Sequence, residues 1–293
     1  MKYQYKHRKP QRKHFPWKKT IIVIVVFFVL LYPFWEAYHL KVEETTLSFQ
    51  NLDPNLKNLR IVFVSDIYQG NYMSQSRVDT LVHTINNLSA DLVLLGGDYA
   101  MNCEGSVHFF QNLPQIQSRL GVYAVLGEHD LNDPTKKFAM LRNTMANSGV
   151  TLLTNEVAKV KRGKTNLYIA GVDDYTVGTP DLEKVASEVT SEEFVILLSH
   201  SPDNLTSAIA QKDENDKGHW FDMALFGHTL GGQIRLGNIT PFINISSNLG
   251  KSFLSGWHEK NRAHILVSRG VGSSRLPIRL FAPPQIHLIT LRK

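Results

Sequence analysis

Acidic and histidine side chains follow a series of short apolar runs in this sequence, at the points where the runs end. The runs cover 60–66, 91–98, 122–130, 193–200 and 222–228. The side chains at their ends are Asp66, Asp98, the corner Glu128-His129-Asp130, His200 and His228. A mixture of carboxylates and imidazoles is typical of zinc, manganese or iron sites. Such groups gathered in one place are costly to bury unless a cation binds among them, so the pattern indicates a divalent metal site.

The elements that must position these side chains are strands and helices in alternation. The runs are rich in Val, Ile and Leu on both faces, which is typical of strands covered on two sides. Apolar residues at helical spacing predict helices over 74–88 and 136–148. This order indicates an α/β fold, in which the carboxyl ends of strands share one edge where ligands bind. Further strands are expected at 166–174, 263–270 and 284–293.

Each of these residues taken alone has an ordinary structural explanation. An Asp after a strand is often a helix cap or a turn residue, and a single His is usually a satisfied polar group. The series as a whole is harder to explain in this way. Glycines beside the candidate ligands let the backbone turn sharply and leave room for a ligand against the main chain. These glycines are Gly96, Gly97, Gly127, Gly227, Gly231 and Gly232.

A basic tail precedes a long apolar segment at the N-terminus. Residues 1–19 hold eight Lys or Arg and no acid, and Ile21 to Trp35 is uncharged. We expect a transmembrane signal anchor over 20–38, because the tail lies beside it and no small-residue cleavage pattern follows, which disfavours a cleaved signal peptide. The positive-inside rule then predicts a single-pass protein of the cytoplasmic membrane, with the tail inside and the main domain outside.

The net charge of +6 belongs to the tail and not to the rest of the chain. Without the tail, 24 basic residues face 26 acidic ones. The main domain therefore has no excess charge to offer a phosphate backbone, and we expect no nucleic-acid partner. The lone cysteine, Cys103, excludes an intrachain disulfide.

Seven blocks in a fixed order resemble the calcineurin-like metallophosphoesterases, in particular their membrane-anchored bacterial branch. The blocks are VSDI (64–67), GGD (96–98), VYAVLGEHD (122–130), AGVDD (170–174), LLSHSPD (197–203), GHTLGGQI (227–234) and LVSRGVGSSRLPIRL (266–280). The resemblance spans 59–293 and leaves 39–58 as a juxtamembrane stalk with room for one edge strand. It implies a four-layer αββα sandwich of two mixed sheets with a two-metal phosphoesterase site between the sheet ends.

The resemblance also implies a role for each matching residue. It assigns one ion to Asp66, Asp98 and positions 68 and 230, and a second ion to Asp98, position 128, His200 and His228. It assigns protonation of the leaving group to His129. Three positions depart from the family pattern: the His of Asp-x-His is Tyr68, the Asn of Gly-Asn-His-Asp is Glu128, and the last His of Gly-His-Thr-His is Leu230.

The departures fall mainly on one of the two ions. Leu230 offers no ligand, and Tyr68 serves only as a phenolate on a strong Lewis acid such as ferric iron. Asp98, Glu128, His200 and His228 still complete one coordination sphere, so we expect one tightly held divalent ion and a weak or empty second position.

Two classes of function are consistent with these ligand positions. In the first, the chain is a metal-dependent hydrolase of a phosphoester or phosphodiester outside the membrane, with a lipid-linked or cell-wall substrate. In the second, it is a pseudoenzyme that binds an envelope ligand or a protein partner. Arg269 and Arg275 are candidates for holding a phosphate, and the alternative interpretation is that they are ordinary surface or ion-paired arginines. The stretch 237–261 reads as a loop that could cover the site.

Overall fold

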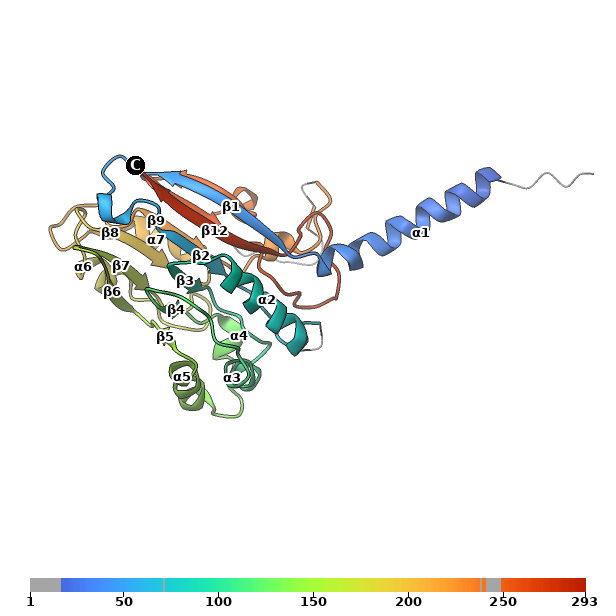
Figure 1. The fold of residues 1–293 in the computed structure, drawn as a ribbon, viewed down its shortest axis with the longest axis horizontal. Coiled ribbons are helices and arrows are strands. Elements are labelled where there is room, and N and C mark those ends of the chain that lie inside the picture. The colour runs from blue at the N-terminus through green and yellow to red at the C-terminus, as the bar shows by residue number, and fades with distance from the viewer. Residues whose placement is uncertain (1–16, 71, 238, 241–248) are drawn as a thin grey trace, which may run out of the picture.

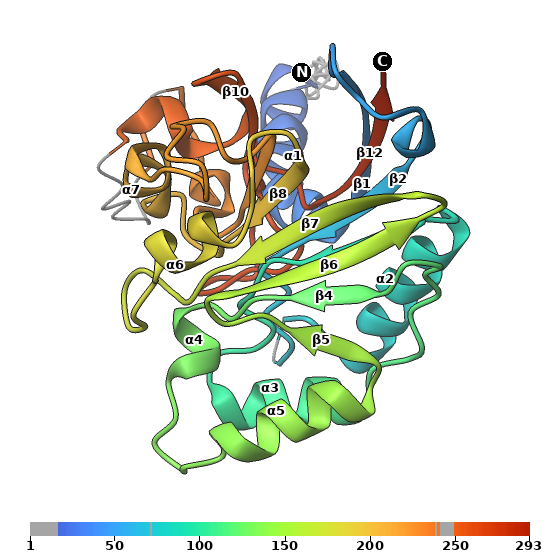
Figure 2. The same ribbon diagram turned by 90° about the vertical axis from the view of Figure 1, so that its left-hand side faces the viewer.

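A computed structural model describes residues 17–70, 72–237, 239–240 and 249–293. Two six-stranded sheets pack face to face, and helices cover the outer face of each (Figures 1 and 2). The predicted four-layer αββα sandwich of two mixed sheets is therefore confirmed. Most of the basic tail, residues 1–16, lies outside the described residues.

The first sheet has the order β1-β12-β2-β3-β4-β5. Strands β2 to β5 are parallel to one another, β12 is antiparallel to β2, and β1 is parallel to β12 at the edge. The strands are β1 (Lys41–Ser48), β2 (Arg60–Val64), β3 (Leu92–Leu95), β4 (Val122–Ala124), β5 (Val150–Leu152) and β12 (Gln285–Arg292).

The second sheet has the order β10-β11-β9-β8-β7-β6. Strands β11, β9, β8 and β7 are parallel, and an antiparallel strand lies at each edge. The strands are β6 (Glu156–Arg162), β7 (Thr165–Gly171), β8 (Phe194–Leu198), β9 (Met223–Phe226), β10 (Gly256–Lys260) and β11 (Ala263–Val267). Part of the stretch 237–261, expected as a loop over the site, is instead strand β10, and its Trp257 packs against the core between the sheets.

Three layers of apolar side chains hold the sandwich together. In β2, Ile61 and Phe63 point into the core between the sheets, whereas Val62 and Val64 point to the helices on the outer face. Strands buried on both faces thus account for the continuous apolar runs of the sequence. A third cluster joins the second sheet to its own helices.

The first sheet is covered by the longer helices and the second by short ones. Val78, Leu81, Val82 and Ile85 form one apolar stripe of α2, which packs on the first sheet. The α-helices of the globular part are α2 (Gln75–Asn87), α3 (Cys103–Gln111), α4 (Glu128–Leu131), α5 (Phe138–Asn147), α6 (Leu182–Ser187) and α7 (Asn204–Ala210). Short 3-10 turns lie at Pro54–Leu56, Leu230–Gly232 and Lys251–Leu254.

Helix α1 (Trp17–Tyr38) projects from one end of the molecule (Figure 1). It is long and apolar enough to cross a membrane, with a mean hydropathy of 2.2. At about 1.5 Å per residue its 22 residues span roughly 33 Å, close to the thickness of a bilayer core.

The segment expected as a stalk is largely built into the domain. Lys41–Ser48 forms the edge strand β1, paired with β12 over its full length, so the sheet begins well before residue 59. The last turn of α1 is docked as well, since Glu36 and Ala37 are buried. Only Tyr38, His39 and Leu40 separate this buried turn from β1. The apolar helix is therefore joined to the globular part without a flexible spacer.

The direction of the strands places the base of α1 and the candidate ligands at the same end. Because β12 is antiparallel to β2 and β1 is parallel to β12, the start of β1 lies at the carboxyl end of β2. Asp66 and Asp98 follow the carboxyl ends of β2 and β3. The base of the apolar helix, which adjoins the start of β1 in Figure 1, is thus at the end of the first sheet that carries the candidate metal centre.

Candidate metal centre

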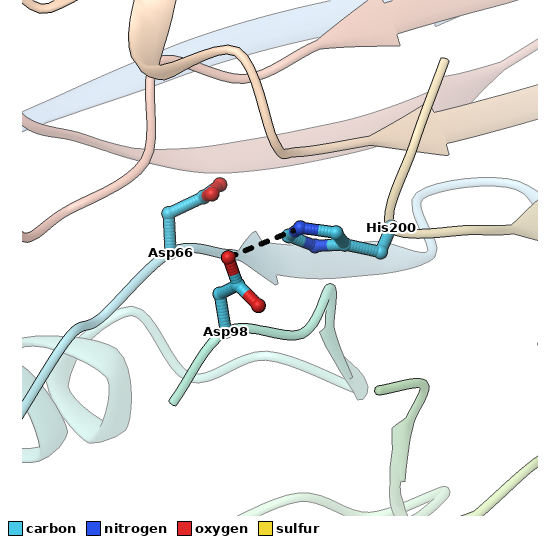
Figure 3. Close-up of side chains that lie close together, drawn as sticks. All are labelled: Asp66, Asp98 and His200. Atoms are coloured by element: carbon cyan, nitrogen blue, oxygen red, sulfur yellow. Dashed lines mark ion pairs between the residues drawn. The ribbon is translucent and has the colours of Figure 1, made fainter. Parts of the chain in front are cut away.

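Three fully buried ionisable side chains from three strand ends converge between the sheets. Asp66 follows β2, Asp98 follows β3 and His200 follows β8, and each is 0% exposed. One ligand atom from each lies within 4.8 Å of the others (Figure 3). Asp66 and Asp98 have φ of 53° and 56°, in the left-handed region that non-glycine residues rarely adopt. Such backbone strain is typical of functional sites, where the surrounding fold holds it in place.

The ring of His200 is oriented as in a metal site. Its Nδ1 lies 2.7 Å from the carbonyl oxygen of Gly96, which fixes the ring and turns Nε2 toward the carboxylates. Nε2 lies 3.3 Å from Oδ2 of Asp98 and has no hydrogen-bond partner. A buried imidazole nitrogen without a partner, facing two carboxylates, is a donor set that fits a divalent cation.

The charges of the three groups are strongly interdependent. Burial raises the pKa of Asp66, and the neighbouring Asp98 raises it further. Burial also raises the pKa of Asp98, but the nearby His200 and His129 outweigh this and hold that pKa well below its usual value. Burial lowers the pKa of His200, whereas the Asp98 carboxylate raises it by more, so the pKa lies well above its usual value. The two carboxylates therefore strongly favour a positive charge between Asp66, Asp98 and His200.

Two glycines beside the centre lie so close to its carboxylates that no larger residue fits at their positions. A Cβ added to Gly127 would lie 2.2 Å from Oδ1 of Asp98, and one added to Gly227 would lie 2.5 Å from Oδ2 of Asp66. These two glycines, both singled out from the sequence, let the main chain approach the carboxylates closely.

A second candidate group consists of Asp98, Glu128 and His129, at the start of α4. The backbone amide of His129 donates to Oδ1 of Asp98 at 3.0 Å, and its Nδ1 lies 2.8 Å from Oδ2. Glu128 Oε1 is 3.7 Å from the same Nδ1. Burial lowers the pKa of His129, but the hydrogen bond and charge of Asp98 raise it by more. The proposed general acid thus contacts the carboxylate shared by both candidate groups.

His228 lies beside the first group with its ring against that of His200. Its backbone amide donates to both carboxylate oxygens of Asp66 at 3.1 Å. The two imidazole rings meet edge to face, with their centroids 5.3 Å apart. The structure therefore brings all five predicted ligands into one connected network. Joint ligation of one ion by Asp98, Glu128, His200 and His228 stays a prediction, because Glu128 groups with His129 and not with His200.

Tyr68 reaches the shared carboxylate directly. Its hydroxyl donates to Oδ2 of Asp98 at 2.6 Å, and its ring packs edge to face on His129. Burial, together with the charges of Asp98 and Asp66, raises the pKa of Tyr68 well above its usual value, so the phenol keeps its proton. Leu230 is buried at φ 51°. Two ligand positions of the family pattern therefore hold a hydrogen-bond donor and an apolar side chain.

Asp130 organises the corner, although no separate role was predicted for it within the Glu128-His129-Asp130 corner. Its Oδ2 accepts from the backbone amides of Asp98 (2.7 Å) and Gly127 (3.0 Å). Its Oδ1 accepts from the amide of Tyr99 and the hydroxyl of Ser106. Burial, with the charge of Asp98, raises its pKa to about 6. The signal in the sequence was its place directly after His129 in a corner already rich in charge.

The three arginines of the last block have different surroundings. Arg269 is half-buried, and its side chain packs over Gly231 beside His228, within the site region. Arg275 is exposed on the following loop. Arg279, which the sequence did not single out, is fully buried and donates to the carbonyl oxygens of Gly272 and Ala282.

A cavity of about 1300 Å³ lies away from the candidate centre. It is lined by residues at the start of β7, β8 and β11 and at the end of β1. The candidate ligands follow the carboxyl ends of the strands, so this cavity lies at the opposite edge of the second sheet. It holds none of the candidate metal ligands.

Comparison with known proteins identifies the family of this chain. Residues 59–232 match the calcineurin-like phosphoesterase family. The chain is 29% identical to the metallophosphoesterase YkuE of Bacillus subtilis over 261 residues, which cover 88% of this chain and 87% of YkuE. It is 27% identical to the phosphodiesterase YaeI of Escherichia coli, covering 81% of this chain and 83% of YaeI. The chain therefore belongs to the calcineurin-like phosphoesterase family.

A vertebrate relative is also named as a transmembrane protein with a metallophosphoesterase domain. The chain is 26% identical to the zebrafish (Danio rerio) transmembrane protein with metallophosphoesterase domain, covering 94% of this chain and 63% of that protein. Together with α1, this relative supports a membrane protein. The family binds divalent metals, and the buried donor set described above fits such an ion.

Proposed function

We propose that this protein is a membrane-anchored, metal-dependent phosphodiesterase that works with one well-held divalent ion. The observation that carries the proposal is the cluster of Asp66, Asp98 and His200, which are fully buried and have ligand atoms within 4.8 Å of one another, and Nε2 of His200 has no hydrogen-bond partner. Two carboxylates and an imidazole buried together are costly without a cation among them. Membership of a phosphoesterase family supports hydrolysis as the reaction.

The residues of the chain have separate roles in this proposal. The ion would act as a Lewis acid on a phosphoryl oxygen, and it would be held by Asp98, His200 and His228, together with Glu128. Asp66 would lie beside it as a ligand of the weak second position. His129, held by Asp98 at 2.8 Å, is placed to protonate the leaving group. Arg269 at the edge of the site offers a guanidinium to the phosphate. Manganese, zinc and iron all suit this donor set.

One observation favours a second candidate function, a binding protein without turnover. The hydroxyl of Tyr68 donates to Asp98, the carboxylate that the family resemblance assigns to both ions, and Leu230 supplies no ligand. In this alternative the centre binds one ion and a phosphorylated ligand or a partner without cleaving it. Loss of the two-metal clamp on attacking and leaving oxygens supports it.

The deciding experiment measures metal content and turnover on the same preparation. The full chain, purified in lipid nanodiscs with Mn²⁺, is assayed by elemental analysis and with bis-p-nitrophenyl phosphate. We expect one equivalent of metal and measurable turnover, both lost in His200→Ala. The matched control is His83→Ala, which removes an exposed histidine of α2 and should change neither quantity. One equivalent of metal without turnover would favour the binding protein, and no bound metal would contradict both.

The cellular side on which the domain lies is a further part of the proposal. The basic tail beside α1 supports a domain outside the cytoplasmic membrane. Protease digestion of intact spheroplasts tests this, because an outer domain is degraded and an inner one is protected.

A further inference from the structure

Four exposed apolar side chains lie on the two loops that lead away from the candidate metal centre, and one of them, Phe281, lies beside Tyr32 of α1. Leu236 is 50% exposed, Ile239 64%, Leu276 37% and Phe281 59%. We refer to these four residues as the apolar rim. Large apolar side chains that gather on one surface mark an interaction site and not an ordinary surface.

Hydrogen bonds and bridges tie the apolar rim into a single surface. The backbone amide of Arg235 donates to the carbonyl of Leu280 at 2.8 Å, which joins the loop carrying Leu236 to the loop carrying Phe281. Leu236 and Ile239 form a bridge with each other. The side chain of Gln233 donates to the carbonyl of Leu276 at 2.8 Å.

The apolar rim continues the surface of the apolar helix. The ring of Phe281 lies 6.4 Å from the ring of Tyr32, within α1. Glu36 accepts hydrogen bonds from the backbone amides of Phe281 and Ala282, and Arg279 donates its amide to the carbonyl of Pro33. The loop is therefore fixed to α1 where the aromatic residues Tyr32 and Trp35 suit the interface of a bilayer.

The backbone at Phe281 is shaped to present its side chain outward. Its φ is 55°, in a region that is rare for a bulky residue. Its neighbours on either side point inward or are half-buried, and Ala282 is fully buried. A strained backbone that exposes an apolar ring is unfavourable in water, and it becomes favourable where that ring leaves water.

Both loops start at the candidate centre. One leads from His228 through Leu230 to Leu236 and Ile239. The other leads from Gly270, which packs against Asp66, to Leu276 and Phe281. Arg235 and Arg275 directly precede Leu236 and Leu276, and Arg275 is exposed. An apolar side chain next to a guanidinium suits the boundary between acyl chains and lipid phosphates.

We infer that the apolar rim lies in the surface of the same bilayer that α1 enters, and that the candidate centre acts on a phosphoester carried in the head group of a membrane lipid. The substrate part of this inference rests on the proposed function. The docking part does not, since it follows from the position of the four side chains relative to α1.

The depth of a fluorescent label in the bilayer tests the docking part, and this measurement does not require the protein to turn over a substrate. Burial raises the pKa of Cys103 to about 12, so its thiol stays unreactive at neutral pH and the full chain can be labelled at an introduced cysteine. Leu276→Cys and Phe281→Cys, carrying a fluorescent label in vesicles of phosphatidylcholine and phosphatidylglycerol, should be quenched by lipids with a nitroxide on the acyl chain. Met140→Cys on α5, 45% exposed in the native protein, is the matched control and should not be quenched. Equal quenching at all three positions, or at none, would overturn the inference.

Two substrates with one leaving group test the substrate part. The soluble substrate is bis-p-nitrophenyl phosphate, and the membrane substrate is a p-nitrophenyl phosphodiester of diacylglycerol in vesicles. Changing all four rim residues to Ser should lower kcat/KM on the membrane substrate at least ~10-fold and leave the soluble substrate within about 2-fold, because only the first is presented from the bilayer. Met140→Ser should change neither value.

The outcomes separate the inference from the proposed function. Equal losses on both substrates, or turnover of the soluble substrate alone by the unmodified protein, would overturn the lipid assignment while leaving a phosphodiesterase. No turnover of either substrate would overturn the proposed function and the substrate part with it, and the label depths would still decide the docking part.

Discussion

The number of metal ions is the property that two substitutions in the candidate centre should control. In the family pattern, histidines stand at the positions of Tyr68 and Leu230. We expect the unmodified protein to bind one equivalent of divalent metal, and the variant Tyr68→His with Leu230→His to bind two. The reason is ligand counting, because the second position has only Asp66 and the shared Asp98 until two imidazoles are added.

The structure sets the size of the effects. Tyr68→His removes a 2.6 Å hydrogen bond to a buried carboxylate, worth about 1.5–3 kcal/mol, and Leu230→His buries an unpaired polar ring at a cost of about 1–3 kcal/mol. The metal-free variant should therefore be less stable by about 2.5–6 kcal/mol. The backbone is not an obstacle, because φ is 52° and 51° at these positions and His is more tolerant of the left-handed region than Tyr or Leu.

Added metal should restore the stability of the double variant and raise its turnover above that of the unmodified protein. Metal at 100 times its dissociation constant contributes about 2.7 kcal/mol per site. A second Lewis acid is typically worth several kcal/mol at the transition state, and about 1.4 kcal/mol is a factor of ten, so turnover of bis-p-nitrophenyl phosphate should rise at least ~10-fold.

Elemental analysis and thermal unfolding with and without Mn²⁺ provide the measurements. Each single substitution is a control, because either change alone leaves the second position short of one imidazole. Two equivalents of metal in the unmodified protein would refute the reasoning, since Tyr68 would then be a ligand. One equivalent in the double variant would refute it as well.

Three further outcomes follow from particular contacts. Glu36→Ala leaves two backbone amides without their acceptor and should lower the free energy of unfolding in nanodiscs by about 2–4 kcal/mol, against less than ~0.5 kcal/mol for the exposed Glu44→Ala. Gly127→Ala, which would bring a Cβ to 2.2 Å from Asp98, should weaken metal binding at least ~10-fold by calorimetric titration, whereas Gly218→Ala meets open space and should not. A chelator should lower the melting temperature of the unmodified protein but not of Asp98→Asn, and an equal drop in both would disconnect Asp98 from the ion.

The four layers of the fold were implied by the family resemblance, whereas the alternation of strands and helices and the meeting of Asp66, Asp98 and His200 follow from the local pattern of the sequence. Strands buried on both faces have continuous apolar runs, and the ends of parallel strands share an edge, so both conclusions depend on local pattern alone. The edge strand β1 was harder to define, because KVEETTLS has one buried residue, Leu47, and its pairing with β12 is far apart in sequence. Its existence depends on a neighbour that the pattern does not specify.

The sequence could not predict which side chains contact one another inside the candidate centre. Which oxygen of Asp98 meets Tyr68 or His129 depends on side-chain direction and reach, and not on spacing along the chain. Arg279 is a similar case, since its burial is made possible by carbonyl acceptors on two separate segments of the loop. Glu36 did carry a signal, because an acid at the end of an apolar helix is costly unless the fold supplies donors.

Glu36 also links the membrane segment to the chemistry through a short series of contacts. Its carboxylate holds the backbone at Phe281 and Ala282, Arg279 bonds to the carbonyl of Gly272, and the amide of Gly272 donates to the carbonyl of Asp66 at 2.7 Å. Because this loop is hydrogen-bonded at both ends, the inferred docking would hold the candidate centre at a fixed height above the bilayer. A flexible tether would let the site reach soluble substrates in any orientation. Under the inferred docking, a rigid junction would restrict the site to phosphoesters presented at one depth, as a substrate in a lipid head group requires.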